Sequence, residues 1–276
     1  MSLTNIETLL VTLEGHVLHI TLNRPKARNA MSLKMVRELM TVFKFYEDDL
    51  SVRAIVLRGA EGHFCAGGDI KDMAGARMAA SQTKADNQTN EADDPFYRLN
   101  REFGRMITFA NQVPQVLIVV TEGAVLGGGF GLACISDVAL SANNAQFGLP
   151  ETGLGIPPAQ IAPFVVTRIG LTQARRLALL GVRFNGEEAM ALGIVHEAHE
   201  PGEALEQALA NVLKQVQRCA PQANRITKKL ILGVGQEDLE QLLDNAAQSF
   251  AAAVQGKEGQ EGTLAFMQKR SPSWNS

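Results

Sequence analysis

Alternation of apolar and polar positions is clearest near the start of the chain. Residues 9–13 and 17–22 alternate in this way on either side of Glu14 and Gly15, a pattern that is typical of a β-hairpin. A polar loop follows at residues 23–30, where a proline opposes regular structure. The chain is therefore expected to begin with two antiparallel strands.

A helix and a third strand are predicted next. Ser32 can cap the helix, because apolar residues recur at helical spacing from position 33 to position 43. Residues 54–57 form a short apolar run that predicts a strand. This order of strand, helix and strand favours an α/β fold in which helices cover a sheet.

The same periodicities predict elements further along the chain. Helices are expected at 95–110, 161–169 and 172–180, and strands at 116–120 and 137–141. Asn185 and Glu188 have the spacing of a capping box, which predicts the start of another helix. Residues 75–94 are polar and poor in large apolar side chains, and they are expected to form a mobile insertion over a site or a disordered surface loop.

Beyond residue 200 the pattern is helical almost to the end of the chain. Breaks are expected near Pro221, Gly233 and Gly256, and apolar residues form one face on each predicted helix. Such an extension can complete the core or pack against another subunit.

Composition limits the class of protein. The chain has 276 residues, of which 46% are hydrophobic, so it can bury a large core. Its formal charge of −3 argues against a general binder of nucleic acid or membranes. Neither a secretory leader nor an apolar run of about 18 residues is visible, and we expect a cytoplasmic protein.

Cysteine and histidine usage indicates neither a disulfide framework nor a metal site. Cys65, Cys134 and Cys219 are odd in number and widely spaced, which fits a reducing compartment. The five histidines form no HExxH motif, and His196 and His199 are expected at the surface after a strand.

Candidate chemistry is concentrated between residues 122 and 158. Three successive glycines at 127–129 let a ligand approach the backbone, and a helix start just after them would favour negative charge. Glu151 follows in a tight loop and is the candidate acid or base. On the local pattern alone, an ordinary glycine loop against a helix is the favoured interpretation.

A second glycine-containing loop supports the functional interpretation. Ala66, Gly67 and Gly68 directly follow a strand-like run, as the three later glycines do. Exposed amides from two such loops could converge on one carbonyl oxygen and stabilise the negative charge that develops there. The two loops together predict an oxyanion hole.

Four motifs resemble those of the crotonase, or enoyl-CoA hydratase/isomerase, superfamily: NRPKARNAMS, FCAGGDIKDM, EGAVLGGGFGLACISD and AQFGLPETGLG. The resemblance covers nearly the whole chain. It implies an α/β fold with a crotonase-like ββα spiral core at residues 1–200, which binds acyl-CoA. It also implies a C-terminal helical oligomerisation region at 201–276, and a homotrimer or a dimer of trimers.

The resemblance also implies roles for individual residues. The amides of Ala66 and Gly128 would polarise the thioester carbonyl, and Glu151 would transfer protons. The CoA portion would lie along Lys26, Ala27, Ala66, Gly67, Gly68, Asp69 and Ile70, and Lys269 would meet the CoA phosphates, often from a neighbouring subunit. For the two lysines, solvated surface charge is an equal alternative. No metal and no separate cofactor are expected, since CoA is part of the substrate.

One departure from the family pattern affects the mechanism. Typical enoyl-CoA hydratases carry two glutamates, and the first of these positions is Gly131 here. Three interpretations remain: hydration with Glu151 alone, movement of a double bond by one carboxylate, and a non-catalytic member that binds acyl-CoA or RNA. The early helix offers Lys34, Arg37 and Lys44 against several acids, which disfavours RNA.

Hydration is favoured by a narrower resemblance. Residues 155–165, Gly131 and the terminal FMQKRSPSW are similar to bacterial hydratases of branched glutaconyl-CoA substrates. These are the methylglutaconyl-CoA and isohexenylglutaconyl-CoA types of leucine and acyclic terpene degradation. We hypothesise that Gly131 makes room for the second carboxylate of such a substrate; the alternative is that it eases close helix packing.

Overall fold

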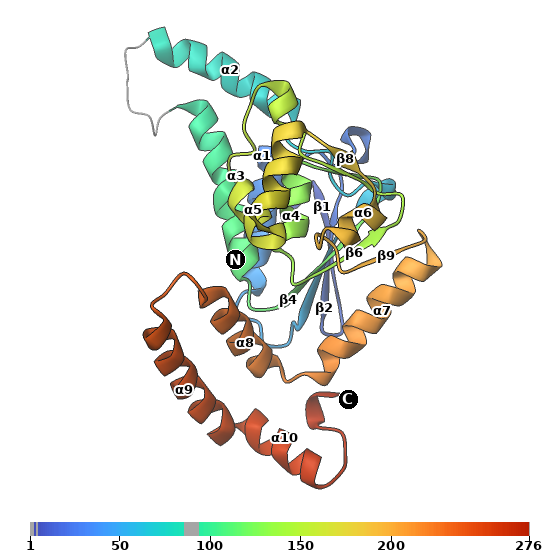
Figure 1. Ribbon diagram of the computed structural model, residues 1–276, viewed down its shortest axis with the longest axis vertical. Coiled ribbons are helices and arrows are strands. Elements are labelled where there is room, and N and C mark those ends of the chain that lie inside the picture. The colour runs from blue at the N-terminus through green and yellow to red at the C-terminus, as the bar shows by residue number, and fades with distance from the viewer. Residues whose placement is uncertain (1–2, 4, 86–93, 276) are drawn as a thin grey trace.

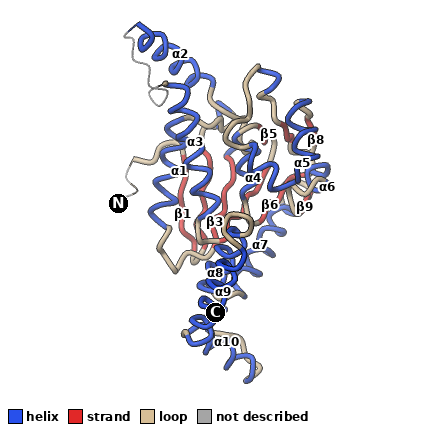
Figure 2. Tube along the Cα trace, turned by 60° about the vertical axis from the view of Figure 1, so that its left-hand side comes forward, coloured by secondary structure: helices blue, strands red, loops and turns tan. Residues whose placement is uncertain are grey.

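Two β-sheets with helices packed around them form the core of the protein (Figures 1 and 2). The structure is a computed structural model that describes residues 3, 5–85 and 94–275. The strands are β1 Leu9–Glu14, β2 Val17–Leu22, β3 Ala54–Gly59, β4 Val116–Thr121, β5 Ala124–Leu126, β6 Val138–Ala142, β7 Gln146–Gly148, β8 Arg183–Phe184 and β9 Glu197–His199.

The helices alternate with these strands and then continue alone to the C-terminus. They are α1 Leu33–Tyr46, α2 Ile70–Ala85, α3 Pro95–Gln112, α4 Gly128–Ile135, α5 Ala162–Leu180, α6 Gly186–Ala191, α7 Glu203–Arg218, α8 Pro221–Gly233, α9 Leu239–Gln255 and α10 Lys257–Met267. Short 3-10 turns are η1 Pro25–Ala27, η2 Ala60–Gly62, η4 Thr152–Leu154 and η5 Ser273–Asn275. The expected α/β class is confirmed.

The larger sheet has the strand order β1-β2-β3-β4-β6-β9. Strands β1 and β2 pair antiparallel as the predicted hairpin, and all the other pairs in this sheet are parallel. Strands β3 and β4 are apolar on both faces because helices cover both sides of a parallel sheet. In Figure 1, α1, α3, α4 and α5 lie on one side of the sheet and α7 on the other.

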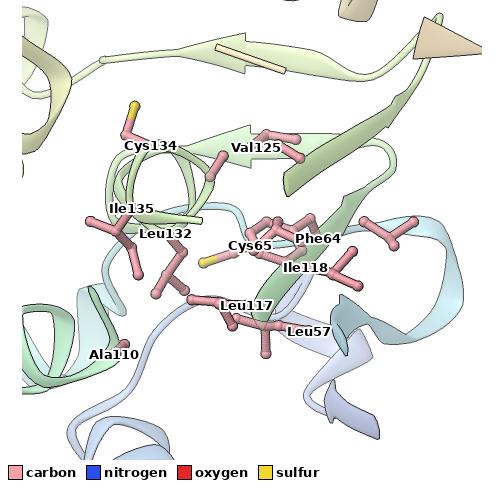
Figure 3. Close-up of a cluster of buried hydrophobic side chains, with 14 of the residues drawn as sticks. Leu57, Phe64, Cys65, Ala110, Leu117, Ile118, Val125, Leu132, Cys134 and Ile135 are labelled. Carbon is pink, nitrogen blue, oxygen red and sulfur yellow. The ribbon is translucent and has the colours of Figure 1, made fainter. Parts of the chain in front are cut away.

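The smaller sheet holds β5, β7 and β8 next to α4. Helix α4 is almost completely buried. Figure 3 shows Leu132 and Ile135 of this helix beside Leu117 of β4, with Cys65 between the helix and the strands. The start of α4 is therefore fixed by packing on several sides.

Several local predictions are confirmed. The Ser32 side chain accepts a hydrogen bond from the Met35 amide at 3.2 Å and caps α1. Asn185 and Glu188 form the expected capping box at α6. The two helices expected at 161–169 and 172–180 form α5, which has non-helical backbone angles at Gly170.

Other segments differ from expectation. Residues 75–85, expected to lack regular structure, continue helix α2, while residues 86–93 lie outside the described part of the chain. Residues 147–151 were expected to form the tight loop that presents Glu151, but 147 and 148 belong to strand β7, which pairs with β5. These differences arise because pairing and packing with distant segments add to weak local preferences.

The C-terminal helices end at the expected breaks. Helix α7 buries an apolar face against β6 and β9, whereas α9 and α10 extend away from the sheet and pack on each other (Figure 1). Large apolar side chains on this extension are exposed, including Phe250 at 72% and Phe266 at 85%. None of the helices in the described residues is long and apolar enough to cross a membrane.

Arg53 connects the start of β3 to the C-terminal part of the chain. Its guanidinium donates hydrogen bonds to the carbonyls of Trp274 at 2.7 Å, Val216 at 2.9 Å and Gln217 at 2.8 Å, and also to the Cys219 carbonyl. The side chain is buried, so these bonds form away from water. Burial also lowers the pKa of Arg53.

We expect Arg53→Met to lower the free energy of unfolding by about 3 kcal/mol, because it leaves buried carbonyl groups without a donor. Urea unfolding followed by circular dichroism measures the change. Arg37→Ala is the matched control: the 62% exposed Arg37 side chain pairs with Glu102 at the surface, and its loss should cost less than about 1 kcal/mol. Equal effects of the two substitutions would contradict the anchoring role.

Candidate active site

Backbone hydrogen bonds bring the two glycine-containing loops together. The Phe64 amide donates to the Glu122 carbonyl at 2.8 Å, and the Cys65 amide donates to the Ala124 carbonyl at 2.8 Å. The Leu126 amide donates back to the Cys65 carbonyl at 2.9 Å. The segment before Ala66 thus pairs with β5, the strand that leads into the three glycines.

Two more segments join this arrangement. The Met31 amide donates to the Gly67 carbonyl at 2.8 Å, and the Gly127 amide donates to the Gly148 carbonyl at 3.2 Å. Gly67 has φ +98° and Gly127 has φ +50°, both in a region that side chains disfavour. Four segments that are distant in sequence therefore meet at the start of α4.

The Ala66 amide is not available to a ligand, which contradicts the prediction that it helps form an oxyanion hole. It donates to the Arg28 carbonyl at 3.0 Å. Within the described part of the chain, no hydrogen bond engages the Gly68 amide or the Gly128 amide. Gly128 is the first residue of α4, where amide groups point out of the helix and favour negative charge. The available pair is therefore Gly68 and Gly128.

Glu151 lies next to the start of α4. Its Oε1 atom is 2.6 Å from the position that a Cβ on Gly127 would occupy, so only glycine at 127 leaves space for this carboxylate. Its Oε2 atom is buried and has no hydrogen-bond partner among the described residues. Burial raises the pKa of the Glu151 carboxyl, although its own backbone amide opposes the shift. Such a group can exchange protons closer to neutral pH than an ordinary glutamate.

Gly131 lies against apolar side chains, and the hypothesis that it makes room for a substrate carboxylate is wrong. A Cβ at this position would lie 2.3 Å from Cγ2 of Ile161 and 3.1 Å from Cδ1 of Ile107. The space that a side chain would take is already filled. Gly131 eases close packing of α4 against α3 and the start of α5.

Helix α3 supplies residues that the sequence did not single out for the site. The ring of Phe103 lies 3.2 Å from the position that a Cβ on Gly128 would take, and Ile107 lies one turn further along. The helical periodicity at 95–110 includes both apolar residues. Their contact with α4 joins segments that are distant in sequence, so the periodicity alone could not predict it. Together with Ile161 they form an apolar wall beside α4.

Asp69, predicted to contact CoA, is already used within the protein. Its carboxylate pairs with the Arg24 guanidinium at 2.5 Å and accepts a hydrogen bond from the Lys71 amide at 2.8 Å. Burial alone would raise the pKa of Asp69, but the Lys71 amide and Arg24 outweigh it, and the pKa is lowered. Asp69 therefore holds the loop in place as a carboxylate.

The other predicted CoA contacts are more open. Lys26 is exposed and Ala27 is half-buried on the turn η1, and Ile70 is 78% exposed at the start of α2. The hydrogen bond between Met31 and Gly67 places this turn's loop beside the glycines. Lys26 and Ile70 are therefore accessible on segments that adjoin the glycine loops.

Lys269 lies elsewhere in the chain. It follows α10, which Figure 1 places at the opposite end of the molecule from α2. A single chain therefore does not bring Lys269 to the glycine loops, and its contact with CoA stays a prediction for an assembly. No group of three or more His, Cys, Asp or Glu side chains suited to a metal ion occurs among the described residues.

Comparison with known proteins gives consistent matches. The sequence profile described as enoyl-CoA hydratase/isomerase matches residues 12–276. A crystal structure of an enoyl-CoA hydratase/isomerase from Marinobacter aquaeolei is similar with a TM-score of 0.92 and 58% identity, covering 98% of this chain and 100% of that one. The structure of Pseudomonas aeruginosa AtuE has a TM-score of 0.92 and 59% identity over the same shares.

A curated relative extends the comparison to a named activity. The 2,3-dehydroadipyl-CoA hydratase of Escherichia coli is 29% identical over 267 residues, which cover 96% of this chain and 98% of that protein. The similarity therefore spans both the glycine loops and the C-terminal helices.

We expect Gly131→Ala to lower the free energy of unfolding by about 1–3 kcal/mol, because its methyl group would overlap Ile161. The matched control is Gly75→Ala in α2, where nothing lies within 4 Å of the new methyl group; it should stabilise by roughly 0.5–1 kcal/mol. Thermal and urea unfolding measure both changes. The double variant Gly131→Ala with Ile161→Ala should show coupling, and a stability of Gly131→Ala equal to that of Gly75→Ala would contradict the packing role.

Proposed function

Because this chain belongs to the enoyl-CoA hydratase/isomerase family, we propose that it adds water across the 2,3 double bond of a branched glutaconyl-type acyl-CoA. It is an enzyme of the hydro-lyase type. The observation that carries the proposal is the position of Glu151: a half-buried carboxylate with one unpartnered oxygen, beside the unoccupied amide of Gly128. This pairs a proton-transfer group with a site for negative charge.

The amides of Gly68 and Gly128 would bind the thioester oxygen of the substrate. When water adds to C3, electrons move from the double bond onto that oxygen and form an enolate. Hydrogen bonds from two fixed amides, one of them at a helix N-terminus, stabilise this charge without reorganisation. The oxyanion site thus favours the transition state over the neutral substrate.

Glu151 would manage both proton steps. As a carboxylate it accepts a proton from the attacking water, whose oxygen bonds to C3. The resulting carboxylic acid then gives that proton to C2 of the enolate, which restores the carboxylate and completes the addition of one water. The raised pKa of Glu151 suits both steps, since the group must first accept and then release a proton.

The acyl group is proposed to carry one apolar branch and a second carboxylate. Phe103, which is partly exposed and lies against Gly128, would supply an apolar contact for the branch. The narrower sequence resemblance favours 3-methylglutaconyl-CoA or isohexenylglutaconyl-CoA, which would place the reaction in leucine or acyclic terpene degradation. The relative named for 2,3-dehydroadipyl-CoA supports a family site that accepts a second carboxylate, since that acyl group carries one.

The CoA portion is proposed to lie along the surface formed by Lys26, Ala27, Gly68 and Ile70, with no separate cofactor. Lys269 would reach the CoA phosphates from another copy in a homotrimer or dimer of trimers. The exposed large apolar side chains of α9 and α10 support such an assembly, because burying them against another copy would remove apolar area from water.

Isomerisation is the second candidate, and the single carboxylate favours it. One acid can move a proton between carbons without handling water. The two reactions differ in product mass, so one experiment separates them.

We expect purified protein to add the mass of one water to 3-methylglutaconyl-CoA or isohexenylglutaconyl-CoA, as measured by mass spectrometry. Unchanged mass with a shifted double bond in a 3-enoyl-CoA would identify an isomerase instead. Because burial raises the pKa of Glu151 and the carboxylate must be ionised to accept a proton, kcat/KM should fall on acidification at a pH above the ordinary range of glutamate.

The control for this assignment is Glu151→Gln, which keeps the shape of the side chain and removes the proton-accepting group. It should lower kcat about 10²–10⁴-fold and abolish the acidic limb of the pH profile. A variant that keeps the wild-type rate would show that another group transfers the proton.

A second prediction tests whether the Gly68 amide belongs to the oxyanion site. Gly68→Pro removes the amide hydrogen, whereas Gly68→Ala retains it, and no atom lies within 4 Å of the added Cβ. We expect kcat/KM of the proline variant to be about 10²–10³-fold below that of the alanine variant. Near-ultraviolet circular dichroism checks that both are folded, and equal rates in two folded variants would remove Gly68 from the oxyanion site.

A further inference from the structure

A polar cluster joins α3 to the segment that follows Glu151. Arg101 donates from Nη1 to Oε1 of Gln160 at 2.9 Å, and Nε2 of Gln160 donates to Oδ1 of Asn100 at 2.7 Å. Arg101 and Gln160 are both partly buried. The cluster thus places the Arg101 guanidinium next to the apolar wall beside α4.

Gly104 makes this contact possible. A Cβ at this position would lie 1.9 Å from Oε1 of Gln160 and 2.5 Å from Nη1 of Arg101. The two side chains therefore meet directly over the backbone of α3. A glycine in the interior of a helix is less favourable than alanine by about 1 kcal/mol. At position 104 this cost accompanies a side-chain contact that an alanine would block.

Arg101 differs from Arg24 and Arg37 in its charge balance. Arg24 pairs with Asp69, and Arg37 pairs with Glu102. Among the described residues, no carboxylate lies within ion-pair distance of Arg101, whose only recorded partner is the neutral amide of Gln160. A guanidinium has five donors in a planar fork that matches a carboxylate, so most of its binding capacity is unused.

The cluster lies beside the space in front of α4. Along α3, Phe103 approaches Gly128 and Ile107 approaches Gly131, so the two helices run in the same direction over this turn. Residues before Phe103 therefore extend past the N-terminus of α4, toward the region where the thioester would bind. Gln160 directly precedes Ile161, which packs on Gly131, so both partners of the cluster border the acyl region.

We propose that Arg101 binds the second carboxylate of the acyl chain and makes the enzyme selective for acidic substrates, with Gln160 holding the guanidinium in the absence of substrate. The inference rests on the proposed function and names the group that would recognise its substrate class. The apolar wall at Gly131 leaves no place for a carboxylate there, whereas Arg101 offers a bidentate partner.

The test compares 3-methylglutaconyl-CoA with 3-methylcrotonyl-CoA, which has the same branch but lacks the terminal carboxylate. We expect Arg101→Gln to lower kcat/KM for 3-methylglutaconyl-CoA about 10–100-fold and to change that for 3-methylcrotonyl-CoA less than about threefold. Arg101→Lys keeps the charge without the fork and should lose an intermediate part of the selectivity. Arg105→Gln, an exposed arginine one turn further along α3, removes the same charge and should leave the ratio unchanged.

Substrate binding to the Glu151→Gln protein, measured by calorimetry without turnover, tests the role of Arg101 separately from the proposed hydratase function. We expect the Glu151→Gln protein to bind 3-methylglutaconyl-CoA more tightly than 3-methylcrotonyl-CoA, and we expect the added Arg101→Gln substitution to remove this difference. That result supports the role of Arg101 even if the wild-type enzyme does not hydrate 3-methylglutaconyl-CoA. Hydration by the wild-type enzyme with the same substrate ratio in the Arg101 and Arg105 variants would overturn the role of Arg101 and leave the proposed function standing. Equal loss for both substrates in the Arg101 variants would also overturn it, because a structural effect does not discriminate between them.

Discussion

Pairing of the segment at Phe64 and Cys65 with the edge of β5 is the constraint on which the site depends. It aligns two loops that are about sixty residues apart in sequence, and the bond from Gly127 to Gly148 adds the segment that carries Glu151. Each bond uses backbone groups, so the geometry is set by main-chain pairing rather than by particular side chains. Gly67 and Gly127 are required for their positive φ angles, and Gly129 is required because it approaches Cys65 closely. A Cβ on Gly129 would lie 2.7 Å from Cβ of Cys65.

Local signals in the sequence were sufficient for much of the fold. The N-terminal hairpin, the Ser32 cap, the capping box at Asn185 and the C-terminal helix breaks depend on residues close together in sequence, and the four motifs correctly indicated the crotonase fold. The Ala66 assignment failed because its amide is taken by Arg28, a residue with φ +47° that belongs to a distant loop. The surroundings of Gly131 were equally inaccessible, since they depend on how α3 and α5 approach α4.

Two carboxylates near the start of α4 have opposite environments. Asp69 is fixed by Arg24 and the Lys71 amide, and its pKa is lowered, so it remains a structural anion. Glu151 has no such partners on Oε2, and burial raises its pKa. The surroundings alone thus hold one acid as an anion within the loop and give the other a raised pKa. The stability given up by burying an unpaired carboxylate is the expected sign of a functional group.

The packing around Gly131 also bears on how such sequences can change. A glutamate at this position, as in two-acid hydratases, would collide with Ile161 and Ile107, so that single substitution is blocked by side chains on two other elements. Conversely, loss of a glutamate at this position would leave a cavity that lowers stability until other side chains fill it. Positions 107, 131 and 161 are therefore expected to vary together between one-acid and two-acid lineages. The number of catalytic carboxylates would then depend on three positions together, of which only position 131 would carry a catalytic side chain.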